Sequence, residues 1–198
     1  MTVPKTTPGR PRSDLSKRAL MAATFEIFRE VGYEKMTMDA VAARAGVGKA
    51  TIYRWYPNKD DLLVEAMSWK AEQDNDLVPD TGSLVGDLIE MIKQRLARDP
   101  LCLNRQACAS TVSALAGNNA LSQTYWETFL IKKRGVYSTI FQRAKQRKEL
   151  AVDADTDMFL DLYWGYMLFG VVMRPRGAVD VESLEEVVSH LVRAFAPR

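Results

Sequence analysis

The most constraining feature of the sequence is a pair of short amphipathic segments, residues 37–45 and 49–55, separated by a turn that contains Gly46. Thr37 is a good N-cap because its side-chain oxygen can accept a hydrogen bond from the first turn of the helix that follows. Gly46 can adopt the left-handed backbone conformation that closes a helix. Two short helices joined by a glycine-bearing turn, with a further helix packed behind them, form a helix-turn-helix unit. The spacing therefore predicts such a unit over residues 37–56.

Longer amphipathic patterns on either side of this pair predict an all-α fold. A first helix is expected from Ser13 or Asp14, both good N-caps, to Val31, with Gly32 as its C-cap. A fourth helix is expected to begin at Asn58 and to end near residue 77. No segment alternates polar and apolar residues for long enough to require a strand. After a linker at residues 78–82, turn-forming residues such as proline, glycine, asparagine and aspartate divide the rest of the sequence. They predict helices near 83–98, 100–116, 119–148, 155–173 and 181–195.

Charge divides the chain into two unlike parts. Residues 1–59 contain 11 lysines and arginines against 5 aspartates and glutamates, whereas residues 60–198 contain 16 against 20. A basic N-terminal part joined to an acidic remainder is expected where one end of a protein binds a polyanion. A solvated basic surface gives the same asymmetry of charge. The expected division is a flexible basic arm at 1–12, a helix-turn-helix domain at 13–75, and a regulatory and dimerisation domain at 76–198.

The second helix of the predicted unit carries the residues expected to read DNA. In a helix-turn-helix this helix enters the major groove and presents its N-terminal residues to the base edges. Ile52 points to the core in the pattern, and Ala50 is small enough for close approach to a base. Donors to phosphates or base edges are available on Lys49, Thr51, Tyr53 and Arg54. The alternative is a small helical bundle with an incidental basic face.

Residues 14–74 closely resemble the N-terminal domain of TetR-family (TetR/AcrR-like) transcriptional regulators. The shared landmarks occur in order and without a gap: Gly32-Tyr33, Thr37-Met38-Asp39-Ala40-Val41-Ala42, the stretch 45–56, Asn58-Lys59 and Leu62-Leu63. The resemblance implies a homodimer that places one recognition helix of each subunit in successive major grooves of a roughly palindromic double-stranded DNA operator. It implies DNA contacts at Thr37, Gly48, Lys49, Ala50, Thr51, Tyr53, Arg54 and Lys59.

Two features qualify this picture of DNA contact. Gly48 stands where the family often has serine, so only a backbone N–H is left there to bind a phosphate. The segment Gly9-Arg10-Pro11-Arg12 looks like the core of a minor-groove AT-hook, in which Arg10 and Arg12 would enter a narrow A·T-rich groove. A disordered, solubilising tail explains these four residues equally well.

The C-terminal half offers apolar surface for a partner subunit and for a ligand. Residues 156–173 are apolar on nearly all sides, so a helix there must be covered all round. The resemblance implies that the last two long helices pair with those of a second subunit as a four-helix bundle. The interface residues expected from the apolar faces of these helices are Phe159, Leu162, Leu184, Val188, Leu191 and Phe195.

A pocket for an unidentified small hydrophobic or aromatic effector is expected in the same half, because aromatic and methionine side chains suit an apolar ligand. A structural core explains most such residues without a ligand. The fourth helix is expected to be the only element that can link such a pocket to the DNA-binding unit. The expected pocket residues are Trp69, Met91, Leu115, Tyr125, Trp126, Phe129, Tyr163, Trp164, Tyr166 and Met167.

Other classes of protein are disfavoured by what the sequence contains. His190 is the sole histidine, and there is no nucleophile elbow or phosphate loop, so no enzyme activity, cofactor or metal site is expected. Cys102 and Cys108 would point apart on one helix and could not easily form a disulfide. The longest nearly apolar run, Met158–Met173, falls short of the roughly 20 residues of a membrane span. Without a secretory signal either, a cytoplasmic protein with no membrane partner is expected.

The function expected from these features is that of a repressor which a small, largely apolar ligand releases from its operator. A ligand-insensitive DNA-binding or architectural protein would share the same N-terminal half. It would differ in showing no effector-dependent change of DNA affinity. An activator is the third possibility, and repression is preferred because of the family resemblance.

Overall fold

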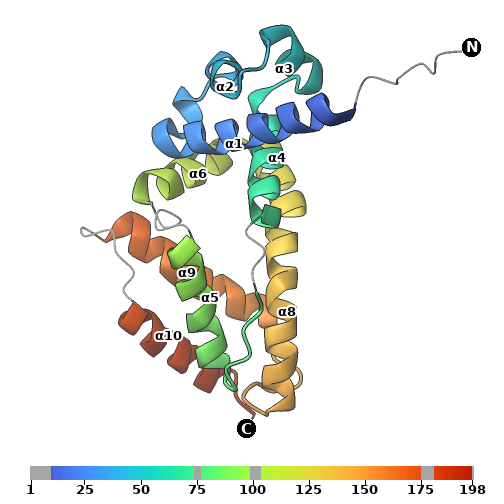
Figure 1. Ribbon diagram of the computed structural model, residues 1–198. Coiled ribbons are helices and arrows are strands. Elements are labelled where there is room, and N and C mark those ends of the chain that lie inside the picture. The colour runs from blue at the N-terminus through green and yellow to red at the C-terminus, as the bar shows by residue number, and fades with distance from the viewer. Residues whose placement is uncertain (1–9, 74–76, 99–103, 175–180, 198) are drawn as a thin grey trace, which may run out of the picture.

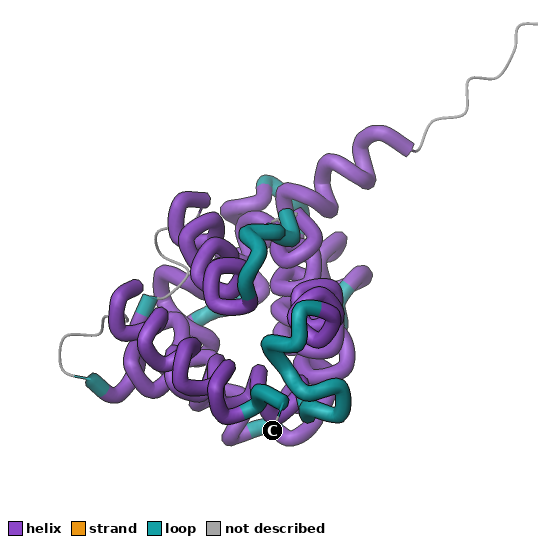
Figure 2. Tube along the Cα trace, turned by 90° about the horizontal axis from the view of Figure 1, so that it is seen from below, coloured by secondary structure: helices purple, strands orange, loops and turns teal. Residues whose placement is uncertain are grey.

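The computed structural model is all-helical over the residues that it describes, which are 10–73, 77–98, 104–174 and 181–197. No strand occurs in these ranges, and Figure 2 shows helices joined by short loops. This confirms the predicted fold class. The elements are α1 (Arg10–Lys35), α2 (Met38–Ala45), α3 (Lys49–Trp55), α4 (Lys59–Gln73), α5 (Leu84–Arg98), α6 (Arg105–Gly117), α7 (Asn119–Tyr125), the π-helical segment η1 (Trp126–Leu130), α8 (Ile131–Gln146), α9 (Thr156–Met173) and α10 (Val181–Ala194).

Side-chain caps and one glycine set the limits of the helix-turn-helix unit, as predicted. The Thr37 hydroxyl accepts a hydrogen bond from the backbone N–H of Ala40 at 3.2 Å and begins α2. Gly46 follows α2 with φ 66° and ψ 28°, the left-handed conformation that glycine adopts without steric cost. The Asn58 side-chain oxygen accepts a hydrogen bond from the backbone N–H of Asp61 at 2.9 Å, which caps α4.

Helix α1 begins earlier than predicted. It starts at Arg10 rather than at Ser13 or Asp14. Pro11 falls in the first turn, where its missing N–H leaves no helical hydrogen bond unmade and its fixed φ suits the helix. Residues 10–12 are therefore helical and not part of a flexible arm, which corrects the expected boundary. Residues 1–9 lie outside the described residues.

The backbone of α1 breaks at Gly32, where the sequence predicted a helix end. Gly32 has φ 79° and ψ 172°, and one further turn carries the chain to Lys35. A Cβ atom built on Gly32 would lie 2.5 Å from the hydroxyl oxygen of Ser110 on α6. Glycine is required here both for its positive φ and for the close approach of α6.

The long helix expected at residues 119–148 is a run of α7, η1 and α8, which begins at Asn119 and ends at Gln146. The wider π turn lies at Trp126–Leu130, in the middle of the run. Helix α6 begins at Arg105 rather than near residue 100. Asn104 caps it by accepting a hydrogen bond from the backbone N–H of Ala107 at 3.0 Å.

Two hydrophobic cores occupy opposite ends of the molecule (Figure 1). The first core contains residues of the four helices α1, α2, α3 and α4, together with Ala114 from α6 and Leu121 from α7. The second core joins α5, α8, α9 and α10. Helices α6 and α7 therefore pack against the first core, although α5 separates them from α4 in the sequence.

Candidate nucleic-acid interface

Helix α3 lies at the end of the molecule opposite the C-terminus, with one face buried and the other exposed (Figure 1). Ile52 is fully buried in the first core, and α3 packs against α2. The Tyr56 hydroxyl, just beyond α3, donates a hydrogen bond to the Glu65 carboxylate on α4 at 2.6 Å. Of the predicted contact residues, Gly48, Lys49, Ala50, Tyr53 and Arg54 are exposed, and Thr51 is half-buried.

A carboxylate of α2 contacts the exposed face of α3. Lys49 Nζ lies 2.6 Å from Asp39 Oδ2, and the Tyr53 hydroxyl lies 3.5 Å from Asp39 Oδ1. The hydrogen bond to Asp39, followed by its negative charge, raises the pKa of Lys49 above its usual value. Lys49 is therefore a cation in the free protein, and Asp39 holds it in place. The sequence pattern contained no signal for this pair, because the two residues belong to different helices.

Two predicted contact residues have other roles in the structure. Lys59 donates a hydrogen bond to the backbone oxygen of Tyr33 at 3.1 Å, and its Nζ lies 4.0 Å from the centre of the Tyr33 ring. Because these contacts turn Lys59 toward α1, a direct DNA contact by Lys59 is not supported by this geometry. Thr37 uses its hydroxyl to cap α2, and that cap occupies one acceptor of the hydroxyl oxygen.

The predicted minor-groove segment is helical in the part of it that the structure describes. Arg10 and Arg12 belong to the first turn of α1, and Gly9 precedes the described residues. An AT-hook requires extended backbone in the groove, so a helical backbone at Arg10–Arg12 argues against that hypothesis.

A three-residue contact at Asp60 joins α1 and α4 to the α6–α7 turn. The Tyr33 hydroxyl donates a hydrogen bond to Asp60 Oδ1 at 2.5 Å, and Asn118 Nδ2 donates to Asp60 Oδ2 at 2.7 Å. Burial, followed by the hydrogen bond to Asp60, raises the pKa of Tyr33 to about 12. Sequence reasoning missed this contact, because Asn118 is 58 residues from Asp60.

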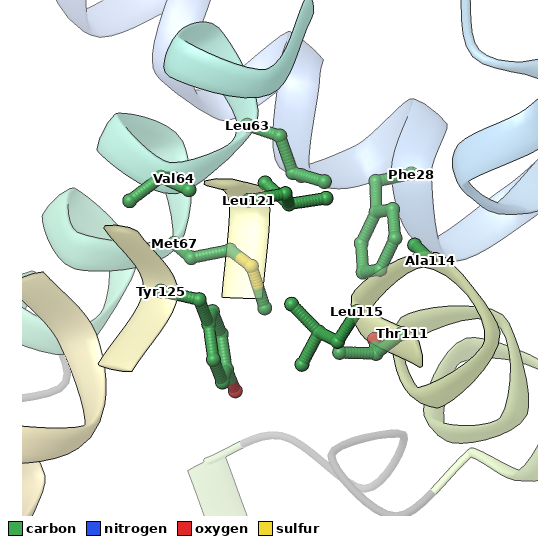
Figure 3. A pocket seen from close by; sticks show the side chains of 9 residues that line it. All are labelled: Phe28, Leu63, Val64, Met67, Thr111, Ala114, Leu115, Leu121 and Tyr125. Atoms are coloured by element: carbon green, nitrogen blue, oxygen red, sulfur yellow. The ribbon is translucent and has the colours of Figure 1, made fainter. Parts of the chain in front are cut away.

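A small apolar cavity lies at the same junction (Figure 3). Its volume is about 10 Å³, which is at the lower limit for holding one water molecule. Small-molecule sites are usually about 300–1,000 Å³, so the cavity is closed to an effector in this structure. It is lined by side chains from α1, α4, α6 and α7: Phe28, Leu63, Val64, Met67, Thr111, Ala114, Leu115, Leu121 and Tyr125.

The ten predicted pocket residues do not surround one cavity, which corrects the sequence-based expectation. Leu115 and Tyr125 line the junction cavity, whereas Trp69 lines an open groove of about 480 Å³ between α1, α4 and α8. Trp126 is 46% exposed. Phe129 packs against the first core, and the remaining five pack in or against the second core: Met91, Tyr163, Trp164, Tyr166 and Met167. Aromatic composition cannot distinguish a core from a cavity.

The predicted dimer residues are mostly core residues of their own chain, which is a second correction. Phe159, Leu184 and Val188 are at most 1% exposed. The Phe195 ring packs on Phe159 with centroids 5.3 Å apart, and Leu191 packs against the same core. The apolar stripe of α10 therefore covers α5 and α9, and only Leu162, 44% exposed, remains on the surface.

The part of the chain that the structure describes shows no group of three or more histidine, cysteine, aspartate or glutamate side chains arranged to hold a metal ion. Among the same residues, none of the helices is both long enough and apolar enough to span a membrane.

Comparison with known proteins identifies the family. Residues 20–66 match the family described as "Bacterial regulatory proteins, tetR family", and residues 78–191 match "Tetracyclin repressor-like, C-terminal domain". The chain belongs to the TetR family. It is therefore a member of a family of DNA-binding transcription regulators, and the resemblance inferred from residues 14–74 is confirmed and extends over the C-terminal half.

Relatives of this TetR-family protein cover most of its length. It is 31% identical to the uncharacterized HTH-type transcriptional regulator Rv1556 of Mycobacterium tuberculosis, over 85% of this chain and 83% of the relative. It is 30% identical to the DNA-binding transcriptional repressor TetR of Mycobacteroides abscessus, over 76% of this chain and 79% of the relative. The structure of Thermus thermophilus FadR, a TetR-family repressor in complex with lauroyl-CoA, superposes with a TM-score of 0.65 at 18% identity, covering 92% of this chain and 96% of that chain.

Proposed function

We propose that this TetR-family protein is a homodimeric repressor that reads a palindromic operator through α3 and is released by a small, largely apolar ligand. The observation that carries the proposal is the exposed face of α3, on which Lys49, Tyr53 and Arg54 project from a helix anchored by buried Ile52. Hydrogen-bond donors on the exposed face of a short helix, whose other face is held in the protein core, suit binding in the major groove of DNA. The name of the Mycobacteroides abscessus relative supports repression.

The exposed face of α9 is the surface best suited to a second subunit. Met158, Leu162, Phe169 and Met173 are each more than 40% exposed, and exposed Gly165 lies on the same stripe. Their spacing puts them on one side of the helix. A continuous apolar stripe in water favours burial against a partner, and homo-oligomers most often close as two-fold dimers. This stripe replaces the α10 residues predicted from the sequence.

The junction cavity is the site at which a ligand would act most directly on the DNA-binding unit. Phe28 and Leu63 on one side belong to α1 and α4, and Leu115 and Tyr125 on the other belong to α6 and α7. Because the cavity holds only about 10 Å³, a ligand must separate these pairs of helices to enter. Such a separation tilts α1 and α4 and changes the spacing of the two α3 helices in the dimer. The lauroyl-CoA bound to Thermus thermophilus FadR supports an apolar ligand for this fold.

The experiment that tests the proposal is selection of duplexes from a random library by the full-length protein. The expected result is an inverted repeat with half-sites about one helical turn apart, bound by two subunits. Acyl chains and planar aromatic compounds are then titrated against the complex. A duplex preference without two-fold symmetry would contradict the dimeric reading.

The small volume of the cavity is the one observation that favours a ligand-insensitive regulator. The two functions differ in whether ligand binding and operator binding affect each other. An effector that lowers the affinity for the operator by some factor must have its own affinity lowered by the same factor when the operator is bound. Ligands that bind equally well to the free protein and to the complex would favour the ligand-insensitive function.

A further inference from the structure

The carboxylate of Asp39 lies where a DNA-binding protein usually avoids negative charge. Asp39 is in the first turn of α2, two residues after the Thr37 cap, on the same face as the exposed residues of α3. The first helix of a helix-turn-helix crosses the DNA backbone. A carboxylate near phosphates weakens binding to any sequence, because like charges repel across water over about one Debye length.

Asp39 compensates for this cost by contacting two donor side chains on the exposed face of α3. Its two oxygens lie 2.6 Å from Lys49 Nζ and 3.5 Å from the Tyr53 hydroxyl. The Lys49 and Asp39 side chains are 69% and 48% exposed. An ion pair this exposed contributes little to stability, so an acceptor of suitable geometry on DNA can compete with it. Arg54, by contrast, is exposed and forms no ion pair with any residue that the structure describes.

We propose that Asp39 determines the sequence selectivity of α3 by retaining Lys49 and Tyr53 until the DNA offers them a better acceptor. The proposal rests on the proposed binding of DNA by α3. On non-specific DNA, Lys49 stays on Asp39, and the carboxylate repels the phosphates. On the operator, a base edge with two acceptors, such as guanine O6 and N7, takes Lys49 from Asp39. Selectivity then arises from weaker binding to wrong sequences as much as from stronger binding to the right one.

The test is Asp39→Asn, which keeps the shape of the side chain and removes its charge. Fluorescence anisotropy would compare a duplex selected by the wild-type protein with a scrambled duplex of the same composition, over a series of salt concentrations. Affinity for the scrambled duplex should rise about threefold to tenfold at low salt. Affinity for the selected duplex should rise less, so the ratio of the two affinities falls. The salt dependence for the scrambled duplex should steepen by about 0.9, the slope of one added phosphate contact.

Two variants separate selectivity from net charge and from folding. Glu72→Gln removes the same charge from a similar exposed pair, Glu72 with Lys132 at 3.0 Å on α4 and α8, and should leave the affinity ratio unchanged. Asp39→Glu keeps the charge and should keep the low affinity for the scrambled duplex. Asp39→Ser, which also removes the charge, replaces Asp39→Asn if that variant has a lowered melting temperature.

The outcomes are distinguishable from failure of the proposed function. If the wild-type protein discriminates between the duplexes and Asp39→Asn discriminates equally well, the role of Asp39 is wrong and DNA reading by α3 stands. If Asp39→Asn and Glu72→Gln raise the affinity for scrambled DNA equally, net charge explains the effect and the inference is also wrong. If the wild-type protein selects no duplex, both the inference and the proposed function fail.

Discussion

The hydroxyl oxygen of Ser110 accepts a hydrogen bond from the backbone N–H of Tyr33 at 2.8 Å, which attaches α6 to the break in α1. The contact spans 77 residues of sequence and lies beside the Asp60 contact of Tyr33 and Asn118. Helix α6 therefore meets the DNA-binding half directly. The expectation that α4 alone links the two halves is wrong, because α6 supplies a second connection.

Replacing Ser110 by alanine should lower the free energy of unfolding by about 1 kcal/mol, because the Tyr33 N–H loses its acceptor in a partly buried place. Urea unfolding followed by circular dichroism measures the change. Ser113→Ala, at an exposed position of the same helix, is the matched control and should change stability by much less. Equal losses in the two variants would show that the hydrogen bond contributes nothing specific.

Replacing Gly32 by alanine should destabilise the protein by about 2 kcal/mol, because a side chain at φ 79° is strained and the new Cβ meets Ser110 Oγ at 2.5 Å. Gly135→Ala is the control: it lies in α8 with no atom within 4 Å of the added Cβ, and should stabilise the helix by up to about 1 kcal/mol. The double variant of Gly32→Ala with Ser110→Ala should be less destabilised than the sum of the two singles, since the clash is with the removed hydroxyl. Strict additivity would contradict the contact.

The raised pKa of Tyr33 predicts a loss of stability in alkali. Its pKa is about 12 in the folded protein against 10.0 for an ordinary tyrosine, so the folded state retains the proton more tightly. The stabilisation is fully present below about pH 10 and is lost as the pH rises from there toward 12. Unfolding measured from pH 8 to 11 should show a shallower decline in Tyr33→Phe than in the wild-type protein.

Charge on the α9 stripe should separate the proposed dimer. Phe169→Glu, at a position 57% exposed, should sediment as a folded monomer and bind a selected duplex weakly, because two half-sites no longer act together. Val152→Glu, 84% exposed and outside α9, should remain dimeric. Val188→Glu should unfold the subunit instead, because Val188 is completely buried. A monomeric wild-type protein would contradict the proposed interface.

Local sequence signals predicted the elements of the fold well where the decisive forces were themselves local. Thr37, Gly46 and Asn58 act through hydrogen bonds or backbone angles within four residues, so their roles could be read from the sequence. The start of α1 was missed because Pro11 is compatible with both an arm and a first helical turn. The exposed face of α3 was predicted correctly because Ile52 fixed the direction of that short helix.

The site could be predicted less completely, because its remaining features depend on which helices meet. The sequence shows that α10 has an apolar stripe, but not that α5 and α9 of the same chain cover it. Likewise, Lys59 is basic and near the helix-turn-helix unit, and only tertiary packing turns it toward Tyr33. The contacts of Ser110 and Asn118 are long-range and follow no local period.

The most direct test of DNA reading by α3 is the affinity of Lys49→Ala and Tyr53→Ala for a duplex selected by the wild-type protein, measured by fluorescence anisotropy at fixed salt. Both side chains project from the exposed face of α3, so each variant should lose about 1–3 kcal/mol of binding free energy while keeping its melting temperature. Lys93→Ala removes an exposed lysine of α5, at the other end of the molecule, and should bind as the wild-type protein does. Wild-type affinity in both α3 variants would contradict the placement of α3 in the major groove.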